Sequence, residues 1–308
     1  MKQHIISILT LLLIPYYLYS EENNIIITDL YSFTKVKDEW KFPGVYSPAN
    51  LFDNDSSTCY MVDKHHKNNE DIHLSIMITF NNPLTIDEIR LINGNGKNEI
   101  LYKESRRVKL LSLYFKTDSE NTKNDYIKED VTLKDTMEFQ NIKLSKTYTF
   151  KQLQIGASIW RDKEKSIYEG EKSNNICLTD ILFYYKGNKI NIINSNNLKQ
   201  KYVSTLTNTL IDNFSDKSYY MDSSEINTKS YKDGRFIVTT ESGILHSIPD
   251  RWKIKDSKLY MRLKGKWRLF EYRLNEPDRK GIILYDPDYN GDIQSDGILG
   301  IFHPDINN

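Results

Sequence analysis

The acidic stretch from Asp286 to Gly297 has the residue types and spacing of a calcium-binding loop. Carboxylate and amide oxygens at alternate positions can wrap a hard cation such as Ca²⁺. Gly297 stands where such a loop carries its bidentate acid, and no flanking helices are predicted. We therefore predict a hairpin turn and no cofactor, with calcium binding as the alternative. The candidate calcium ligands are Asp286, Asp288, Asn290 and Asp292.

A second group of side chains lies in or beside the predicted loops of the first half of the chain. Aromatic rings can stack on the apolar faces of sugars, and polar side chains can hydrogen-bond sugar hydroxyls. A simpler interpretation is that Trp40 covers an edge of the fold and that the two histidines are solvated. The candidate ligand-binding residues are Trp40, Tyr60, His65, His66, Asn95 and Tyr102.

Asp53 and Asp55 lie in the segment FDNDSST. Short acidic side chains in such a segment typically hold a turn by hydrogen bonds to the backbone. A cation bound by this loop is the alternative. Arg107 is expected to pair with Asp53 or Asp135 in a buried structural bridge rather than to contact a ligand.

Cys59 and Cys177 are the two cysteines of the chain. In an oxidising compartment they could form a disulfide, and two buried thiols are the alternative. Neither cysteine has the paired Cys or His spacing of a zinc site.

Known catalytic motifs are absent from the sequence. The chain has no G-x-S-x-G, no H-E-x-x-H and no phosphate-binding loop. Adjacent acids such as Asp87 and Glu88 point to opposite faces of a strand, whereas a glycosidase needs two carboxylates across a cleft. The sequence therefore predicts a protein without enzymatic activity.

The composition favours a β-rich chain of two domains. Its 308 residues include 21 tyrosines but only 13 glycines and 8 prolines. The 42 Lys and Arg residues balance the 42 Asp and Glu residues, which argues against general affinity for nucleic acid but permits local basic patches.

Residues 1–20 have the features of a secretory signal. Lys2 precedes an apolar run from Ile5 to Ile14, and cleavage is expected near Ser20. An uncleaved N-terminal anchor is the alternative. We expect an exported protein, whether secreted, periplasmic or at the cell surface, without a transmembrane span in the mature chain.

Alternating apolar residues predict a β-sandwich in residues 21–187. The segments 71–80, 84–91, 108–115, 148–155 and 176–184 carry the pattern of half-buried strands, and Asn81-Asn82-Pro83 is expected to separate the first two. Residues 119–129 are expected to form a loop, and no helix is predicted.

The pattern changes after an Asn-rich linker at residues 188–197. Tyr202, Leu206, Leu210 and Phe214 recur every four residues and predict a helix. Short strands with turns between them follow. Residues 198–308 are therefore predicted to form one helix and a small β-meander or barrel.

Five segments in a fixed order resemble the NADase-type glycan-binding domain, a discoidin-like, galactose-binding-like jelly roll. They span roughly residues 30–187 and are YSPANLFD at 46–53 with Thr58, Pro83 to Gly94, Tyr102 with Arg107-Val108-Lys109, Leu133 to Thr136, and Thr179 to Phe183. Tyr60 stands where the family usually has Trp, and Ser105-Arg106 stands where an Asn often precedes the Arg.

The resemblance implies a mainly β protein whose first domain binds a glycan at the loop end of its sandwich. The leading expectation is an exported carbohydrate-binding or adhesion-type protein. One alternative is a structural or protein-binding component of the cell envelope. A second is a binding module attached to an unrecognised enzyme in residues 198–308.

Overall fold

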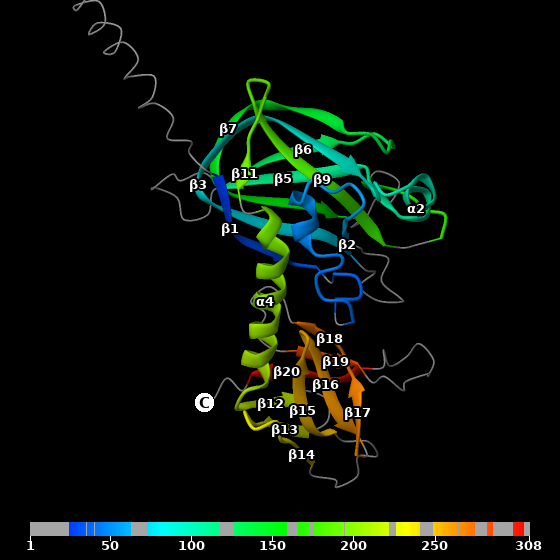
Figure 1. Ribbon diagram of the computed structural model, residues 1–308, viewed down its shortest axis with the longest axis vertical. Coiled ribbons are helices and arrows are strands. Elements are labelled where there is room, and N and C mark those ends of the chain that lie inside the picture. Colours follow the sequence, from blue (N-terminus) through cyan, green and yellow to red (C-terminus); the bar gives the residue numbers. More distant parts are fainter. Residues whose placement is uncertain are drawn as a thin grey trace, which may run out of the picture.

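The protein is described by a computed structural model over residues 25–34, 36–39, 41–62, 73–116, 126–158, 166–172, 175–193, 195–221, 226–240, 249–263, 265–274, 282–285 and 298–304. Figure 1 shows a β-rich first half and a smaller β-rich second half, joined by one long helix. The elements of the first half are β1 (Ile25–Ser32), η1 (Pro48–Phe52), β2 (Tyr60–Val62), β3 (His73–Asn93), α2 (Glu99–Glu104), β4 (Arg107–Val108), β5 (Leu110–Lys116), β6 (Tyr126–Thr132), β7 (Gln140–Ser158), β8 (Ile167–Tyr168), β9 (Ile176–Tyr185), β10 (Asn188–Lys189) and β11 (Ile192–Ile193).

The first half is a two-layer β-sandwich of jelly-roll type. One layer contains β1, the start of β3, the end of β7, and strands β5 and β6. The other contains the end of β3, the start of β7, and strands β9, β10 and β2. Because β3 and β7 run through both layers, their hydrogen bonds join all of these strands into one continuous sheet.

The bend of β3 lies at Asn81-Asn82-Pro83, where the sequence predicts a break. The pairing of β3 with β7 shifts register between Thr79 and Leu84. Pro83 fits this irregularity because it has no backbone N–H to donate to a ladder. The segment therefore bends one long strand instead of separating two.

Two other segments also differ from the sequence expectation. The residues 126–129, expected in a loop, begin β6 and pair with β5. The residues 99–104 form the short helix α2, which begins after Asn98, whose side chain accepts a hydrogen bond from the Leu101 amide. A six-residue helix is too short to produce a detectable helical period.

The core between the layers is apolar and rich in phenylalanine. Phe80, Phe115, Phe150 and Phe183 are each at most 1% exposed. Phe80 packs edge-on against Phe150 and Phe183, and Phe115 stacks on Tyr148. These rings fix the two layers face to face, as the alternating strand pattern predicts.

The second half contains one helix and two further sheets, in agreement with the predicted small β-rich region. The helix α4 packs its apolar stripe against a six-stranded sheet of order β14-β13-β12-β20-β19-β18 and a three-stranded sheet of order β15-β16-β17. The elements are α4 (Ser195–Phe214), β12 (Lys217–Met221), β13 (Ile226–Ser230), β14 (Phe236–Thr240), β15 (Pro249–Lys255), β16 (Lys258–Leu263), β17 (Lys266–Leu269), β18 (Glu271–Leu274), β19 (Ile282–Tyr285) and β20 (Ile298–Pro304).

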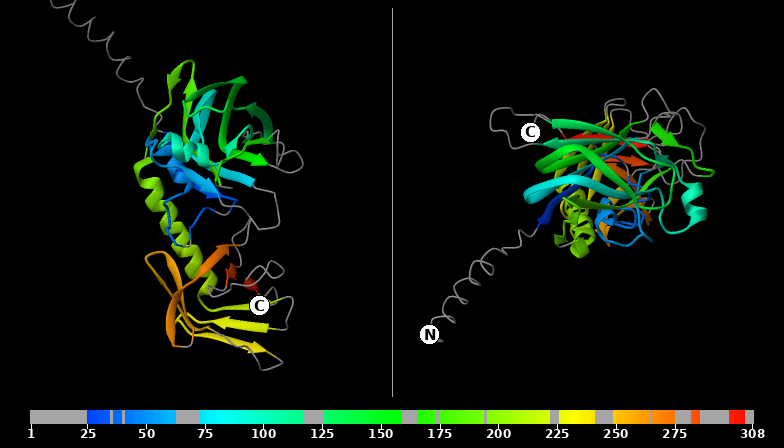
Figure 2. Two further views of the ribbon diagram at one scale, coloured as in Figure 1. Left: turned by 90° about the vertical axis from the view of Figure 1, so that its right-hand side faces the viewer. Right: turned by 90° about the horizontal axis from the view of Figure 1, so that it is seen from above.

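The helix α4 contributes to both halves. Leu198 lies in the sandwich core, whereas Leu206, Leu210 and Phe214 lie in the core of the second half. Figure 2 shows the helix running from the side of the sandwich to the lower sheets. In the segment 188–197, β10 and β11 pair with β9 and β1 before α4 begins. Within the described part of the chain, helices fall short of the length and apolar character needed to cross a membrane.

Candidate loop-end binding site

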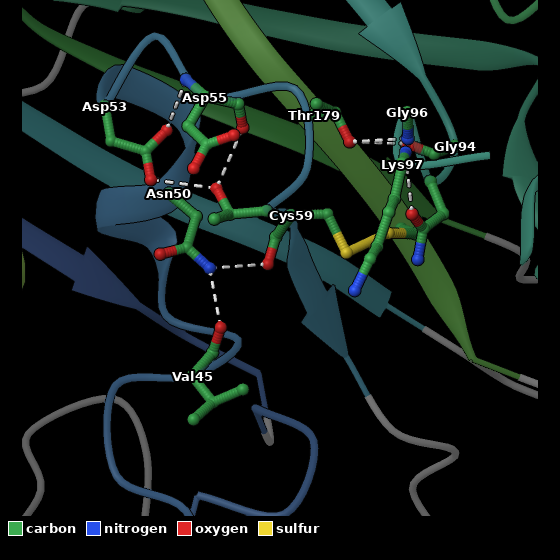
Figure 3. The surroundings of a disulfide bond; sticks show 12 residues. Val45, Asn50, Asp53, Asp55, Cys59, Gly94, Gly96, Lys97 and Thr179 are labelled. Atoms are coloured by element: carbon green, nitrogen blue, oxygen red, sulfur yellow. Dashed lines mark hydrogen bonds between the residues drawn. A yellow bond between two sulfur atoms is a disulfide. The ribbon is translucent and has the colours of Figure 1, made fainter.

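Two loops meet at one end of the sandwich, and we call them the loop end. They are the loop Asp53–Thr58, which leads toward β2, and the turn Asn93–Asn98, which joins β3 to α2. The Cys59–Cys177 disulfide lies beside both loops (Figure 3). A Cβ built on Gly96 would meet the Ser56 carbonyl oxygen at 2.9 Å, so the two loops are in direct contact.

The loop Asp53–Thr58 is held by its own acidic side chains, as predicted. The Asp55 amide donates to an Asp53 carboxylate oxygen at 3.0 Å, and the Thr58 hydroxyl donates to the other at 2.8 Å. The Ser57 hydroxyl and amide donate to Asp55, and these hydrogen bonds lower the pKa of the Asp55 carboxyl. Both carboxylates therefore serve the shape of the loop.

The turn Asn93–Asn98 depends on its two glycines. Gly94 has φ of +97°, and a Cβ there would meet Arg107 and Tyr102 side-chain carbons at 2.7 and 2.9 Å. The Gly96 amide donates to the Thr179 hydroxyl at 3.1 Å, and that hydroxyl donates to the Gly94 carbonyl at 2.8 Å. Only glycine fits at Gly94, and the Thr179 hydroxyl of β9 holds the turn by two hydrogen bonds (Figure 3).

A disulfide joins Cys59 and Cys177, which is one of the two states expected from the sequence. Their Cα atoms are 6.3 Å apart and 118 residues apart in sequence. The Gly94 amide donates to the Cys177 carbonyl oxygen at 3.1 Å. The buried Asn50 side chain donates to the carbonyl oxygens of Cys59 and Val45 (Figure 3). These contacts fix the backbone beneath the loop end.

Arg107 forms the predicted bridge with Asp135, but only the arginine is buried, since the Asp135 side chain is 38% exposed. Its Nε and Nη2 donate to the two Asp135 oxygens at 2.8 and 3.0 Å. Its Nη1 donates to the Ser105 carbonyl oxygen at 2.7 Å, and the Tyr102 hydroxyl donates to Asp135 at 2.6 Å. Hydrogen bonds from Arg107, together with Tyr102, lower the pKa of Asp135.

Asp180 is a buried carboxyl beside the acidic loop. It is 3% exposed, and one of its oxygens has no hydrogen-bond partner in the described part of the protein. Burial, followed by repulsion from Asp53 and Asp55, raises the pKa of Asp180 to about 6. Burial and the two neighbouring carboxyl groups therefore disfavour the ionisation of Asp180.

The loop end presents a row of exposed polar side chains. Ser56 and Lys97 lie on the two contacting loops, and Asn54 and Asn98 flank them. The Asn54 side chain accepts from Lys189 at 3.1 Å. Together these groups offer hydroxyl, amide and ammonium functions on a fixed backbone, which suits hydrogen bonding to a polyhydroxylated ligand.

The structure places three of the predicted ligand-binding residues in the interior. Tyr60 is fully buried, and its hydroxyl lies 2.7 Å from the Ser32 Oγ and 3.0 Å from the Thr34 Oγ1. Asn95 and Tyr102 are each 7% exposed, and Asn95 accepts from the Lys97 amide within the turn. A buried ring has no free face for a sugar, so we correct the assignment of Tyr60 and Tyr102 as stacking residues.

The other predicted site residues lie outside the described part of the chain. They are Trp40, His65 and His66, and the candidate calcium ligands Asp286, Asp288, Asn290 and Asp292. The hairpin turn expected at residues 286–297 stays a prediction, with calcium binding as its alternative. Among the described residues, no group of three or more His, Cys, Asp or Glu side chains is arranged to hold a metal ion.

The residues that sequence reasoning missed are Ser56, Lys97 and Asn98. Their side chains are polar and common in ordinary turns, so residue type alone does not distinguish them. The available signal was their place beside FDNDSST and NGNG, since both segments predict tight turns.

Residues 28–184 match the family model described as "NAD glycohydrolase translocation F5/8 type C domain". The chain belongs to this family. The match covers the strands of the sandwich from β1 to β9, together with both loops of the loop end. It confirms the discoidin-like resemblance drawn from the sequence. No match was found among curated proteins.

Several solved structures are similar to this F5/8 type C chain at low identity. The CBM32-1 and CBM32-2 domains of Clostridium perfringens ZmpB share 14% identity, over 52% of this chain and 35% of that one, with a TM-score of 0.37. The chitosan-binding module 1 of a chitosanase/glucanase from Paenibacillus sp. IK-5 shares 11%, over 52% and 96%, at 0.35. The CBM32 of AlyQ, in complex with 4,5-unsaturated mannuronic acid, shares 12%, over 52% and 95%, at 0.33.

Proposed function

We propose that this F5/8 type C chain binds a glycan at the loop end of its sandwich. The observation that carries the proposal is the pair of contacting loops, whose backbones are fixed from beneath while Ser56 and Lys97 stay exposed. A fixed backbone lowers the conformational entropy lost when a ligand is bound. The membership of a discoidin-like family supports the same proposal.

The chemistry of the loop end favours hydroxyl-rich ligands over apolar ones. The exposed groups of the two loops are donors and acceptors, and two of the aromatic rings predicted to line the site, those of Tyr60 and Tyr102, are buried. Recognition in the described part of the site would therefore depend on hydrogen bonds, each contributing about 0.5–1.5 kcal/mol. Such a site would bind single glycans weakly and gain from repeated epitopes on a surface.

A glycan array probed with the full chain tests this proposal. The double variant Ser56→Ala/Lys97→Ala removes two exposed hydrogen-bonding groups and should weaken binding roughly tenfold. The matched control is Lys146→Ala/Lys151→Ala, which removes two exposed lysine side chains from β7. Equal binding by the native chain and the Ser56/Lys97 variant would remove the site, and an array without hits would remove the function.

We further propose that the protein is exported and has no enzymatic activity. The signal-like features of residues 1–20 support export, and the lack of a known catalytic motif supports the second point. Fractionation of producing cells, with protease added outside, should find the chain accessible from outside the cytoplasm.

Hydrolysis of arrayed glycans by the purified chain would contradict the non-enzymatic proposal. Capture of an envelope protein that persists with excess glycan would favour the alternative of a protein-binding component.

A further inference from the structure

The charge of the chain is strongly uneven, although the total is zero. Residues 249–274 contain nine Lys or Arg against three Asp or Glu, a net charge of +6, so the rest of the chain carries −6. This segment forms the whole three-stranded sheet β15-β16-β17 and β18. The positive charge is therefore concentrated on one small sheet of the second half.

Strand alternation places most of these cations on one face of the sheet. Trp252, Leu259, Met261 and Leu263 point into the core with α4. Their neighbours must point to the opposite, outer side, because successive side chains alternate. The cations of this outer side, which we call the basic face, are Arg251, Lys253, Lys255, Lys258 and Arg262.

The strand register groups these cations closely. Arg251 lies opposite Arg262, and Lys255 lies opposite Lys258 across the β15-β16 pair. Like charges that face each other across a strand pair destabilise a sheet. Within the described residues, the one ion pair on the basic face is that of Arg262 with Asp250. Most of the positive charge is therefore open to a partner.

Two aromatic rings lie among the cations. Trp267 of β17 is 41% exposed, and the Lys253 Nζ lies 4.1 Å from its ring centroid. The same Nζ lies 5.8 Å from the Tyr260 ring centroid. The rings hold the ammonium by a cation–π contact and keep part of their surface free.

We propose that the basic face binds an acidic polysaccharide. The carboxylate or sulfate groups of such a polymer would contact the lysines, and the C–H faces of its sugars would pack on Trp267. An extended chain fits a face with many separate charges, because each charge adds a contact without a deep pocket. The basic face lies in the second half, so this inference goes beyond the proposed function of the loop end and does not depend on it.

The arrangement favours an acidic polysaccharide over a lipid surface or a nucleic acid. Membrane insertion needs apolar side chains that project beyond the cations, but the Trp267 ring lies against the Lys253 ammonium. Nucleic acid binding usually combines a basic groove with several stacking rings, and here two rings share one lysine.

Binding of the full chain to immobilised polygalacturonate and dextran sulfate tests the inference, with neutral dextran as the blank. We expect saturable binding to the two acidic polymers that weakens as NaCl rises from about 0.05 M to about 0.5 M, because salt screens exposed charges. The variant Lys253→Glu/Lys255→Glu should bind about tenfold more weakly or worse. The matched control Lys146→Glu/Lys151→Glu changes the net charge equally on the exposed side of β7 and should bind like the native chain.

Two further variants sharpen the test. Lys253→Gln/Lys255→Gln removes the two charges without reversing them and should show an intermediate loss of binding. It keeps the test possible if the glutamate variant folds poorly. Trp267→Ala should show a loss that persists at high salt, because stacking is not screened. Ser56→Ala/Lys97→Ala should bind the acidic polymers like the native chain, which separates this site from the loop end.

The inference is overturned by any of four results. They are no binding of the native chain to either acidic polymer, equal loss in the basic-face and control variants, preferential binding to vesicles that contain about 30% phosphatidylserine, and preferential binding to a single-stranded oligonucleotide.

Discussion

Arg107 is almost completely withdrawn from water, and its guanidinium depends on the Asp135 carboxylate for a charged partner. We expect Asp135→Ala to lower the free energy of unfolding by about 1–3 kcal/mol, less than for a fully buried pair because the Asp135 side chain is 38% exposed. Urea unfolding measures this loss.

The control for this prediction is Glu99→Ala. Glu99 pairs with Lys103 on the surface of α2, where both side chains are more than half exposed. Its loss should change the free energy of unfolding by about 0–0.5 kcal/mol. Similar effects of the two substitutions would show that Arg107 does not need Asp135.

Asp180 gives a pH dependence with a definite sign. Its pKa is about 6 in the folded chain and near 3.8 otherwise, so the folded state binds more protons between these values. The free energy of unfolding must therefore fall as pH rises from about 4 to about 6. Asp180→Asn removes the ionisation and should stabilise the protein at pH 7 by up to about 3 kcal/mol, with no gain below about pH 4.

Denaturant unfolding of Asp180→Asn and the native chain across this pH range, with a chelator present, measures the difference. Asn tolerates the positive φ of 37° at this position, so backbone strain does not obscure the result. A constant difference between pH 4 and pH 7 would contradict the assigned pKa.

The charged and sulfur-containing contacts of single residues were partly predictable. The turn at Asp53 and Asp55 follows from a short local pattern. For Arg107 and for the two cysteines the sequence left two alternatives open, because their partners are distant in the chain. The burial of Tyr60 did not, because its strand β2 is three residues long and shows no readable alternation. The sequence alone does not distinguish a tyrosine whose hydroxyl has buried partners from a tyrosine on an exposed loop.

At the scale of elements, the Cys59–Cys177 disulfide joins the segment before β2 to β9. Cross-linking such distant positions removes conformational entropy from the unfolded chain. We expect Cys59→Ser/Cys177→Ser to lower the free energy of unfolding by about 2–5 kcal/mol. Thermal unfolding should show that a reducing agent lowers the Tm of the native chain but not that of the variant. Two titratable thiols in the unreduced native chain would contradict the bond.

The helix α4 was predictable because its apolar stripe recurs every four residues over its whole length. The bent strand β3 was not predictable, because Asn81-Asn82-Pro83 is typical of a turn. Only the pairing with β7 on both sides of this segment shows that the strand continues. The stripe gives a test within one helix. Leu210 is 0% exposed, so Leu210→Ala should lower the free energy of unfolding in urea by about 2–5 kcal/mol. Ile211 is 39% exposed, so Ile211→Ala should lower it by less than about 1 kcal/mol.

At the scale of the whole molecule, α4 belongs to two cores at once. Leu198 packs with the sandwich, and the Tyr202 hydroxyl donates to Glu39 of the first half. The second half begins with the same helix, so the orientation of the two halves depends on one continuous element. Sequence reasoning predicted the helix, but it could not show that its first turns pack on the sandwich, because that contact is with residues far away in the chain.

Hydrogen exchange of the full chain should separate the two roles of α4. Leu198→Ala leaves a cavity in the sandwich core and should therefore speed exchange in β1 and η1. The free energy of opening measured there should fall by about 2–5 kcal/mol. Leu210→Ala should instead speed exchange in β15 and β16. If Leu198→Ala speeds exchange only in the second half, then Leu198 does not belong to the sandwich.

The parallel pairing of β11 with β1 has a consequence for the order of folding. Ile25 and Ile26 lie beside Ile192 and Ile193, so the first strand of the sandwich meets its last neighbour only after almost two thirds of the chain has been made. Pairings between such distant segments form slowly. A nascent chain can pair β1 with β3 early, but Ile25 and Ile26 at the start of β1 have to wait for β11 through most of synthesis. Refolding should therefore include a slow late step and be prone to aggregation at high protein concentration.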